Sequence, residues 1–201
     1  MKYEEQKFNI PDLKGITKKN IEEHLKLYAG YVKHTNLILE KIEEYKKDAE
    51  KNAYALGEIQ RRFSFEFNGM RNHEYYFKSL EGESKVLTIT SPLKKAIESH
   101  FGTWSLWLAM FKSIALTRGI GWAILYFDPI AQNLVHAWVD EQHLGQLNGC
   151  HIVLAIDMWE HSYVADYQPS GKQQYVEDFF TNLNWTTIEE NYNNASTYIR
   201  N

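Results

Sequence analysis

The chain has 201 residues, of which 44% are hydrophobic and 24% charged, and this balance excludes a disordered protein. Its formal net charge of −4 argues against general binding of nucleic acids. The single cysteine, Cys150, excludes an intrachain disulfide framework and fits a reducing compartment. The N-terminus lacks the apolar core of a signal peptide, and no stretch approaches the roughly 18 apolar residues of a membrane span. We therefore expect a soluble, cytoplasmic protein.

Two long helices are predicted in the N-terminal part of the chain. Thr17 is a suitable N-cap, and apolar residues then recur at helical spacing from Ile21 to Ile42, which predicts one helix to about Tyr45. Residues 54–80 form a second helical region, rich in aromatic side chains. A charged stretch joins the two helices. We therefore predict an N-terminal domain, residues 1–90, built as an antiparallel helical hairpin.

The remainder, residues 91–201, is predicted to be an α/β domain. Ser91 and Pro92 open a third helix, with the serine as its cap. Three β-prone runs follow at residues 122–127, 134–139 and 150–156, and a turn beginning at Asp128-Pro129 separates the first two. The third run is almost wholly apolar, which favours a central strand buried on both faces. The predicted fold class is α+β, with the hairpin followed by an α/β half with a three-stranded antiparallel sheet.

Several common chemistries lack their motifs. The sequence has no His-Glu-x-x-His zinc-protease helix, no Gly-x-Ser-x-Gly nucleophile elbow and no Walker loop. Gly119 and Gly121 precede a predicted strand instead of following one, so they do not form a dinucleotide-binding fingerprint. None of the histidines has the glutamate three residues earlier that di-iron bundles require.

Four side chains could share one metal ion. Asp157 and His161 stand four residues apart where the third strand ends, and they can converge if the chain turns into a helix between them. A charged surface turn explains this pair equally well. His24 lies on the inner face of the first helix, and His73 lies among aromatic residues of the second. A lone inward histidine is more often a hydrogen-bonded core residue, but iron and manganese accept mixed imidazole and carboxylate ligands.

Five blocks, in order along essentially the whole chain, resemble the signature blocks of iron/manganese superoxide dismutases. They are HLKLYAGYVKHTN from His24, Asn72-His73, GIGW from Gly119, DMWEH from Asp157, and Asn184-Trp185. The resemblance implies disproportionation of superoxide to dioxygen and hydrogen peroxide, with a metal cycling between its +3 and +2 states. It maps the family's ligands for one manganese or iron ion per subunit onto His24, His73, Asp157 and His161.

The resemblance also implies roles for residues around the ion. Tyr31 becomes the gateway tyrosine, Tyr28 takes the position of a gate-forming histidine, and Trp122 and Trp159 wall the cavity. Glu160 is implied to reach the metal-ligand histidine of a second subunit in a homodimer or a dimer of dimers. Without the resemblance, the tyrosine and the tryptophans are ordinary core aromatics, and Glu160 is a solvated carboxylate.

The position of one glutamine bears on the choice of metal. Manganese-type members carry a solvent-contacting glutamine before the third strand, a place that Gln142 suits. Iron-type members often carry it on the second helix, four residues before the histidine, where this chain has Gly69. This favours manganese, although His143 adjoins Gln142 and either residue could point inward.

The first helix departs from the family pattern. The family's ligand histidine stands eight residues before the gateway tyrosine, whereas His24 stands seven before Tyr31, so a gapless alignment puts Glu23 in the ligand place. We interpret the difference as a one-residue deletion that removes a π-type widening of the helix. A tyrosine that in the family commonly reaches the gate histidine from the partner subunit is replaced by Val164.

Two other functions stay open on the sequence alone. One is a metal-free structural or interaction relative with the same fold, which the presence of all four candidate ligands argues against. The other is a mononuclear iron oxygenase with two histidines and one carboxylate, which needs a cosubstrate pocket. Metal analysis combined with a superoxide-scavenging assay separates these possibilities from a dismutase.

Overall fold

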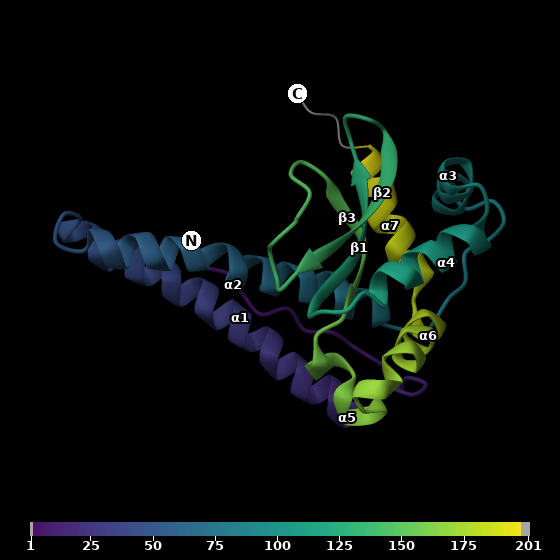
Figure 1. Cartoon of the computed structure of the whole chain (residues 1–201), viewed down its shortest axis with the longest axis horizontal. Coiled ribbons are helices and arrows are strands. Elements are labelled where there is room, and N and C mark those ends of the chain that lie inside the picture. Colours follow the sequence, from purple (N-terminus) through teal and green to yellow (C-terminus); the bar gives the residue numbers. More distant parts are fainter. Residues whose placement is uncertain (1, 198–201) are drawn as a thin grey trace.

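The computed structural model describes residues 2–197 and begins with a long helical hairpin (Figure 1). Helices α1 (Lys18–Tyr45) and α2 (Ala53–Leu80) form its two arms, and the short 3₁₀ helix η1 (Lys46–Asp48) lies between them. The Thr17 hydroxyl accepts a hydrogen bond from the Asn20 amide at 3.2 Å and so caps α1. Both predicted helices are confirmed to within one residue.

Two shorter helices, α3 (Pro92–Phe101) and α4 (Trp104–Ala115), connect the hairpin to the sheet. The predicted cap is confirmed, because the Ser91 hydroxyl accepts from the Lys94 amide at 3.1 Å. Gly102 then adopts a φ of +94°, a conformation that glycine tolerates, and this ends α3. The sequence prediction did not separate α4 from α3.

The sheet has three antiparallel strands in the order β2-β1-β3, as the predicted fold class requires. The strands are β1 (Gly121–Asp128), β2 (Asn133–Asp140) and β3 (His151–Asp157), and each matches a predicted run to within one residue at either end. The prediction that the third run is the central strand is wrong, because β1 lies between the other two. β3 is an edge strand, but α2 and α7 (Trp185–Ser196) pack against it, which accounts for its apolar sequence.

The last part of the chain folds back toward the start of α1. It contains the 3₁₀ helices η2 (Glu160–Ser162) and η3 (Pro169–Gly171) and the helices α5 (Val164–Tyr167), α6 (Lys172–Asn182) and α7. The Asp166 carboxylate accepts hydrogen bonds from the amide and hydroxyl of Thr17, at 2.9 and 2.8 Å. As a result, η2 lies against α1 at the end of β3.

The predicted division of the chain at residues 90 and 91 falls in the loop between α2 and α3. Its outer ends, residue 1 and residues 198–201, lie outside the described residues, and the division stays a prediction. No helix within residues 2–197 is both long and apolar enough to cross a membrane.

Candidate metal centre

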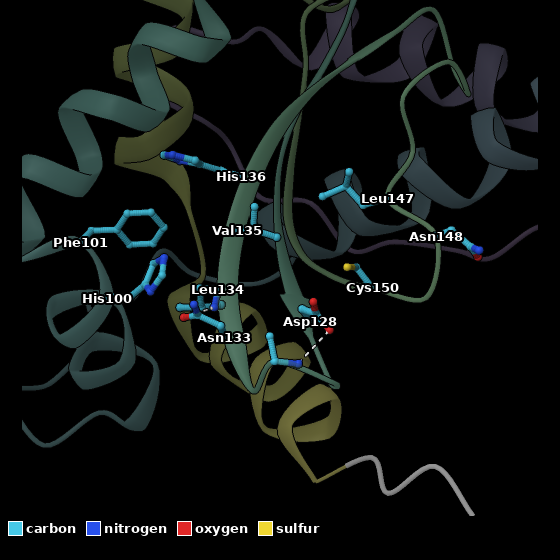
Figure 2. Close-up of a pocket in the computed structure, with 11 residues that line it drawn as sticks. His100, Phe101, Asp128, Asn133, Leu134, Val135, His136, Leu147, Asn148 and Cys150 are labelled. Carbon is cyan, nitrogen blue, oxygen red and sulfur yellow. Dashed lines mark hydrogen bonds between the residues drawn. The ribbon is translucent and has the colours of Figure 1, made fainter.

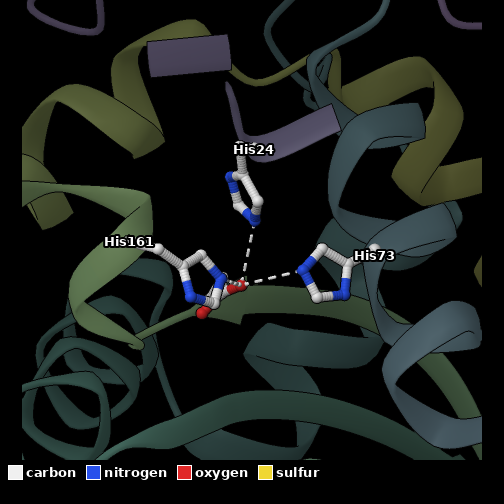
Figure 3. A group of neighbouring side chains, drawn as sticks. His24, His73 and His161 are labelled. Carbon is white, nitrogen blue, oxygen red and sulfur yellow. Dashed lines mark hydrogen bonds and ion pairs between the residues drawn. The ribbon is translucent and has the colours of Figure 1, made fainter. Parts of the chain in front are cut away.

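Four side chains from four separate elements meet where the hairpin joins the sheet (Figure 3). His24 comes from α1, His73 from α2, Asp157 from the end of β3, and His161 from η2. The Asp157 Oδ2 lies 3.1 Å from the Nε2 of both His24 and His161, and 3.4 Å from that of His73. One candidate ligand atom from each residue lies within 4.8 Å of the others.

The turn after β3 brings Asp157 and His161 together. The Trp159 amide donates to Asp157 Oδ1 at 2.8 Å, and the Ser162 hydroxyl donates to the Asp157 carbonyl at 2.9 Å. These two bonds fold the chain tightly enough for η2 to start at Glu160. The predicted convergence of an aspartate and a histidine four residues later is therefore found in the structure.

His73 presents an unprotonated nitrogen to the cluster. Its Nδ1 lies 2.6 Å from the Gly69 carbonyl, which can only accept, so Nδ1 carries the proton and Nε2 holds a lone pair. Within the described residues, this buried Nε2 has no hydrogen-bond partner. Burial lowers the pKa of His73 to about 3, and burial likewise lowers the pKa of His24, so both rings are neutral.

Asp157 supplies the negative charge of the cluster. Burial alone would raise its pKa, but the adjacent His161 and the hydrogen bonds with His161 and His24 outweigh burial and hold the pKa of Asp157 well below its usual range. An ionised carboxylate, two buried neutral imidazoles and a third imidazole, with an orphaned nitrogen facing the carboxylate, fit a cation that accepts nitrogen and oxygen ligands. Iron and manganese are such cations.

Comparison with known proteins identifies the family. Residues 89–191 match the model for iron/manganese superoxide dismutases, C-terminal domain. The chain is 32% identical over 181 residues to superoxide dismutase (Mn/Fe) of Aeropyrum pernix, which covers 86% of this chain and 80% of that protein. It is 36% identical to superoxide dismutase (Fe) of Cupriavidus metallidurans, with 86% of each chain covered. The chain belongs to the iron/manganese superoxide dismutase family.

A third relative, superoxide dismutase (Mn) of Mycobacterium lepraemurium, is 31% identical over 87% of this chain and 83% of its own length. The similarities thus extend over both the hairpin and the α/β half. Relatives named for iron, for manganese and for both metals are similar to this chain, so the family assignment supports an iron or manganese cofactor without choosing between them.

The structure separates the two first-helix candidates. His24 is buried in the cluster, whereas Glu23 is exposed and pairs with Lys26 at 2.7 Å. Helix α1 is continuous and has no π-type widening between His24 and Tyr31. This geometry is what the proposed one-residue deletion requires.

Gln142, and not His143, points toward the cluster. Its amide donates to the Tyr31 hydroxyl at 3.0 Å and accepts from the Trp122 indole N–H at 2.9 Å. The rings of Tyr31 and Trp122 both lie 5.0 Å from that of His73, centroid to centroid. His143 packs instead against Phe65, at 5.7 Å between ring centroids.

Gly69 leaves no space for a side chain of its own. A Cβ atom at this position would lie 2.5 Å from Cδ1 and 2.7 Å from Cε1 of Tyr31. The Tyr31 ring therefore occupies the volume that a larger residue at position 69 needs. Burial also raises the pKa of Tyr31 well above its usual range, so the phenol keeps its proton at neutral pH.

The hydroxyl of Tyr28 is engaged by the N-terminal segment and by α2. It accepts from the Gln6 amide at 2.9 Å and donates to the Glu74 carboxylate at 3.2 Å. Its ring lies 6.5 Å from that of His73, and burial raises the pKa of Tyr28 to about 12. Tyr28 therefore packs beside the cluster, while its polar end is bonded to groups outside it.

Trp159 and Glu160 lie on the more open side. The Trp159 ring stacks on His161 at 5.9 Å, and its indole N–H donates to the Glu141 carbonyl at 3.0 Å. The Glu160 side chain is exposed on this single chain. Val164 starts α5 and is partly buried against the core.

Sequence reasoning missed two neighbours of the cluster. Phe77 lies one turn after His73 on α2, and its ring is 4.9 Å from that of His24. Glu74 is buried directly beside His73 and bonds to Tyr28. The position of Phe77 could have been found from its four-residue spacing to His73, whereas the pairing of Glu74 with Tyr28 depends on how α1 and α2 are packed.

A separate hollow of about 470 Å³ lies beside β2 (Figure 2). The Phe101 ring lies 4.5 Å from that of His100 and 4.9 Å from that of His136, so it stands between the two imidazoles. Figure 2 places Cys150 on the other side of the strand from these rings. The arrangement does not bring metal-ligating atoms together, and none of the four cluster residues lines this hollow.

Proposed function

We propose that this chain is a superoxide dismutase that converts superoxide to dioxygen and hydrogen peroxide at the cluster of His24, His73, Asp157 and His161. The observation that carries the proposal is the buried His73 Nε2, whose lone pair faces the ionised Asp157 carboxylate with no hydrogen bond to satisfy it. When bound there, one iron or manganese ion per subunit supplies one-electron chemistry by alternating between its +3 and +2 states.

The charge of the cluster suits an anionic substrate. The Asp157 carboxylate is the one negative group among the four side chains, and the imidazoles of His24 and His73 are neutral. Three imidazoles and one carboxylate offset a single positive charge of a bound cation. The remaining positive charge attracts superoxide.

The residues around the cluster fix the orientation of the polar groups that a substrate would meet. Trp122 and Tyr31 fix both ends of the Gln142 amide, which orients its N–H₂ group toward the tyrosine. Because Gln142 donates to the Tyr31 oxygen, the Tyr31 proton is directed elsewhere and is available to a substrate. Trp159 and Trp122 exclude water from the sides of the cluster. Tyr28 contributes packing against His73 instead of a polar group.

Manganese is the metal that we favour. Gln142 approaches the cluster from the segment before β3, as expected of manganese-type members, and His143 is directed to Phe65. The Tyr31 ring fills the space that a glutamine at position 69 needs. Metal analysis of protein grown with both metals tests this preference.

The active form that we propose is a homodimer or a dimer of dimers. Glu160 is exposed beside His161, whose side chain is 22% exposed, so a second subunit can bring its Glu160 to this ring. A ligand histidine commonly donates its second N–H to such an acceptor. A cytoplasmic location is part of the same proposal, and it rests on the single cysteine.

The decisive experiment pairs metal analysis with a superoxide-scavenging assay on Asp157→Ala and on the natural sequence. We expect the natural sequence to hold about one ion per chain and to scavenge superoxide. Asp157→Ala should lose metal and activity together. Full metal and full turnover in this variant would disprove the site, and a natural sequence without metal would favour the structural relative.

A further inference from the structure

The segment before α1 is bonded to both arms of the hairpin (Figure 1). Near its start, the Tyr3 amide donates to the side-chain oxygen of Asn36 on α1 at 2.8 Å, and the Asn36 side-chain amide donates back to the Tyr3 carbonyl at 2.9 Å. Further on, the Asn9 amide donates at 2.8 Å to the carboxylate of Glu81, which directly follows α2. Residues 3–9 therefore cross from one helix to the other, and we call them the strap.

One aromatic ring of the strap, that of Phe8, packs behind the cluster. Its centroid lies 5.7 Å from that of Tyr28 and 5.5 Å from that of Phe77. The Phe77 ring in turn lies 4.9 Å from that of His24. The Tyr28 ring lies 6.5 Å from that of His73 and is stacked on it. A single ring thus separates Phe8 from each of these two candidate ligands.

The strap also holds Tyr28 by its hydroxyl. The Gln6 main-chain amide donates to the Tyr28 oxygen at 2.9 Å, and the hydroxyl donates to the Glu74 carboxylate at 3.2 Å. The Glu74 side chain is itself fixed, because it is only 10% exposed and accepts from Arg71 at 2.7 Å. A ring that is bonded at its hydroxyl and packed against Phe8 has little room to move in a close-packed interior.

The strap and Gln142 hold different neighbours of His73. The rings of Tyr31 and Trp122 both lie 5.0 Å from that of His73, and both residues are hydrogen-bonded to Gln142. Tyr28 has no bond to Gln142 and is held by the strap instead. The place of the His73 ring therefore depends on the strap as well as on the groups around Gln142.

We propose that Phe8 is a positioning residue, which holds Tyr28 and Phe77 against His24 and His73 and thereby slows the release of the metal ion. This inference rests on the proposed metal site. Phe8 acts through the two intervening rings and takes no part in the reaction. Loss of a group that bonds directly to a ligand typically costs 10–100-fold in metal affinity, and Phe8 lies one layer further out, so we expect an effect of about three- to tenfold.

The test compares Phe8→Ala with a matched control, Phe101→Ala. Phe101 is also partly buried and packed between two rings, at 4.5 Å from that of His100 and 4.9 Å from that of His136, but it lies in the hollow beside β2. Both substitutions remove the same ring, and both should lower the thermal stability. Phe8→Leu keeps most of the apolar volume and should behave like the natural sequence.

Release of the metal is the first measurement. Each protein is loaded with manganese or iron, whichever the natural sequence retains, and loss of the metal to excess chelator is followed well below the unfolding temperature. Phe8→Ala should release the metal about three- to tenfold faster than the natural sequence. Phe101→Ala and Phe8→Leu should stay close to the natural rate. Equal acceleration in the two alanine variants would assign the effect to general destabilisation and overturn the proposal, as would an unchanged rate in Phe8→Ala.

A second measurement needs no metal. In the chelator-treated protein, the Nδ1 proton of His73 is bonded to the Gly69 carbonyl, and its exchange with solvent can be followed by NMR. Exchange should be faster in Phe8→Ala than in Phe101→Ala, because only Phe8 holds the rings around His73. If the natural sequence binds no metal but exchange responds in this way, the proposed function fails and the positioning role stands. If the natural sequence is an active dismutase and neither metal release nor exchange responds to Phe8→Ala, the positioning role fails.

Discussion

Substitution of Gly69 by alanine tests how tightly the Tyr31 ring is held. The added methyl group would lie 2.5 Å from Tyr31 Cδ1, about 0.9 Å short of the 3.4 Å at which ordinary contact begins. Forcing an extra carbon into such a packed place costs about 1–3 kcal/mol. Alanine recovers about 0.5–1 kcal/mol of helix propensity over glycine. The net loss of stability is therefore roughly 0–2.5 kcal/mol, and the Tyr31 ring should be displaced from Gln142.

Gly57 provides the matched control on the same helix. It is exposed, and a Cβ there meets no atom within 4 Å, so Gly57→Ala should stabilise by about 0.5–1 kcal/mol. At about 2–4 °C per kcal/mol for a chain of this size, thermal unfolding should shift in opposite directions for the two variants. Only Gly69→Ala should also lower dismutase activity per bound metal. A rise in Tm for Gly69→Ala equal to that for Gly57→Ala would refute the reasoning.

Three further predictions concern the cluster. His24→Gln should reduce metal content while Glu23→Gln leaves it unchanged, and the reverse result would show that a carboxylate replaces the imidazole. Burial depresses the pKa values of His24 and His73, so below the unfolded pKa of about 6.5 the unfolded chain binds more protons. As the pH falls from 6.5 to 4, the free energy of unfolding of chelator-treated protein should therefore decrease by up to about 1.4 kcal/mol per pH unit for each histidine. Urea titration at several pH values measures this change. A free energy of unfolding that does not vary with pH would contradict neutral buried rings. Glu160→Ala should weaken dimerisation and metal retention by about 3–5 kcal/mol, which sedimentation and metal analysis on one sample would measure. A variant that stays fully dimeric and fully metallated would argue against a hydrogen bond between Glu160 of one subunit and His161 of the other.

Periodicity predicted the helices and strands well because each element buries one recognisable face. The apolar run at residues 150–156 shows the limit of that signal. A strand between two others and an edge strand covered by helices have the same composition, so the position of β3 in the sheet depends on the packing of α2 and α7. The ends of β1 and β3 were easier to predict than the strand order, because they coincide with Asp128-Pro129 and with Asp157.

The residues of the candidate site could be predicted from the sequence, but the directions in which the neighbouring side chains point could not. His24, His73, Asp157 and His161 could be named from their blocks, and the structure brings all four together. The choice between Gln142 and His143 could not be made, because it depends on partners at positions 31 and 122 that are far away in sequence. The hydrogen bonds of the Tyr28 hydroxyl to Gln6 and Glu74 could not be predicted either, because both partners are distant from Tyr28 in the sequence.

The acceptor that orients His73 belongs to the main chain. A side-chain acceptor can be lost by a single mutation, whereas the carbonyl at position 69 persists whatever amino acid the gene encodes there. The orientation of His73 is thus inherited with the helix itself. Mutation at position 69 is constrained by the neighbouring Tyr31 ring and not by His73. A larger residue at position 69 would become acceptable in a lineage that first replaces Tyr31 by a smaller side chain. The Gly69 carbonyl position would still hold the His73 ring.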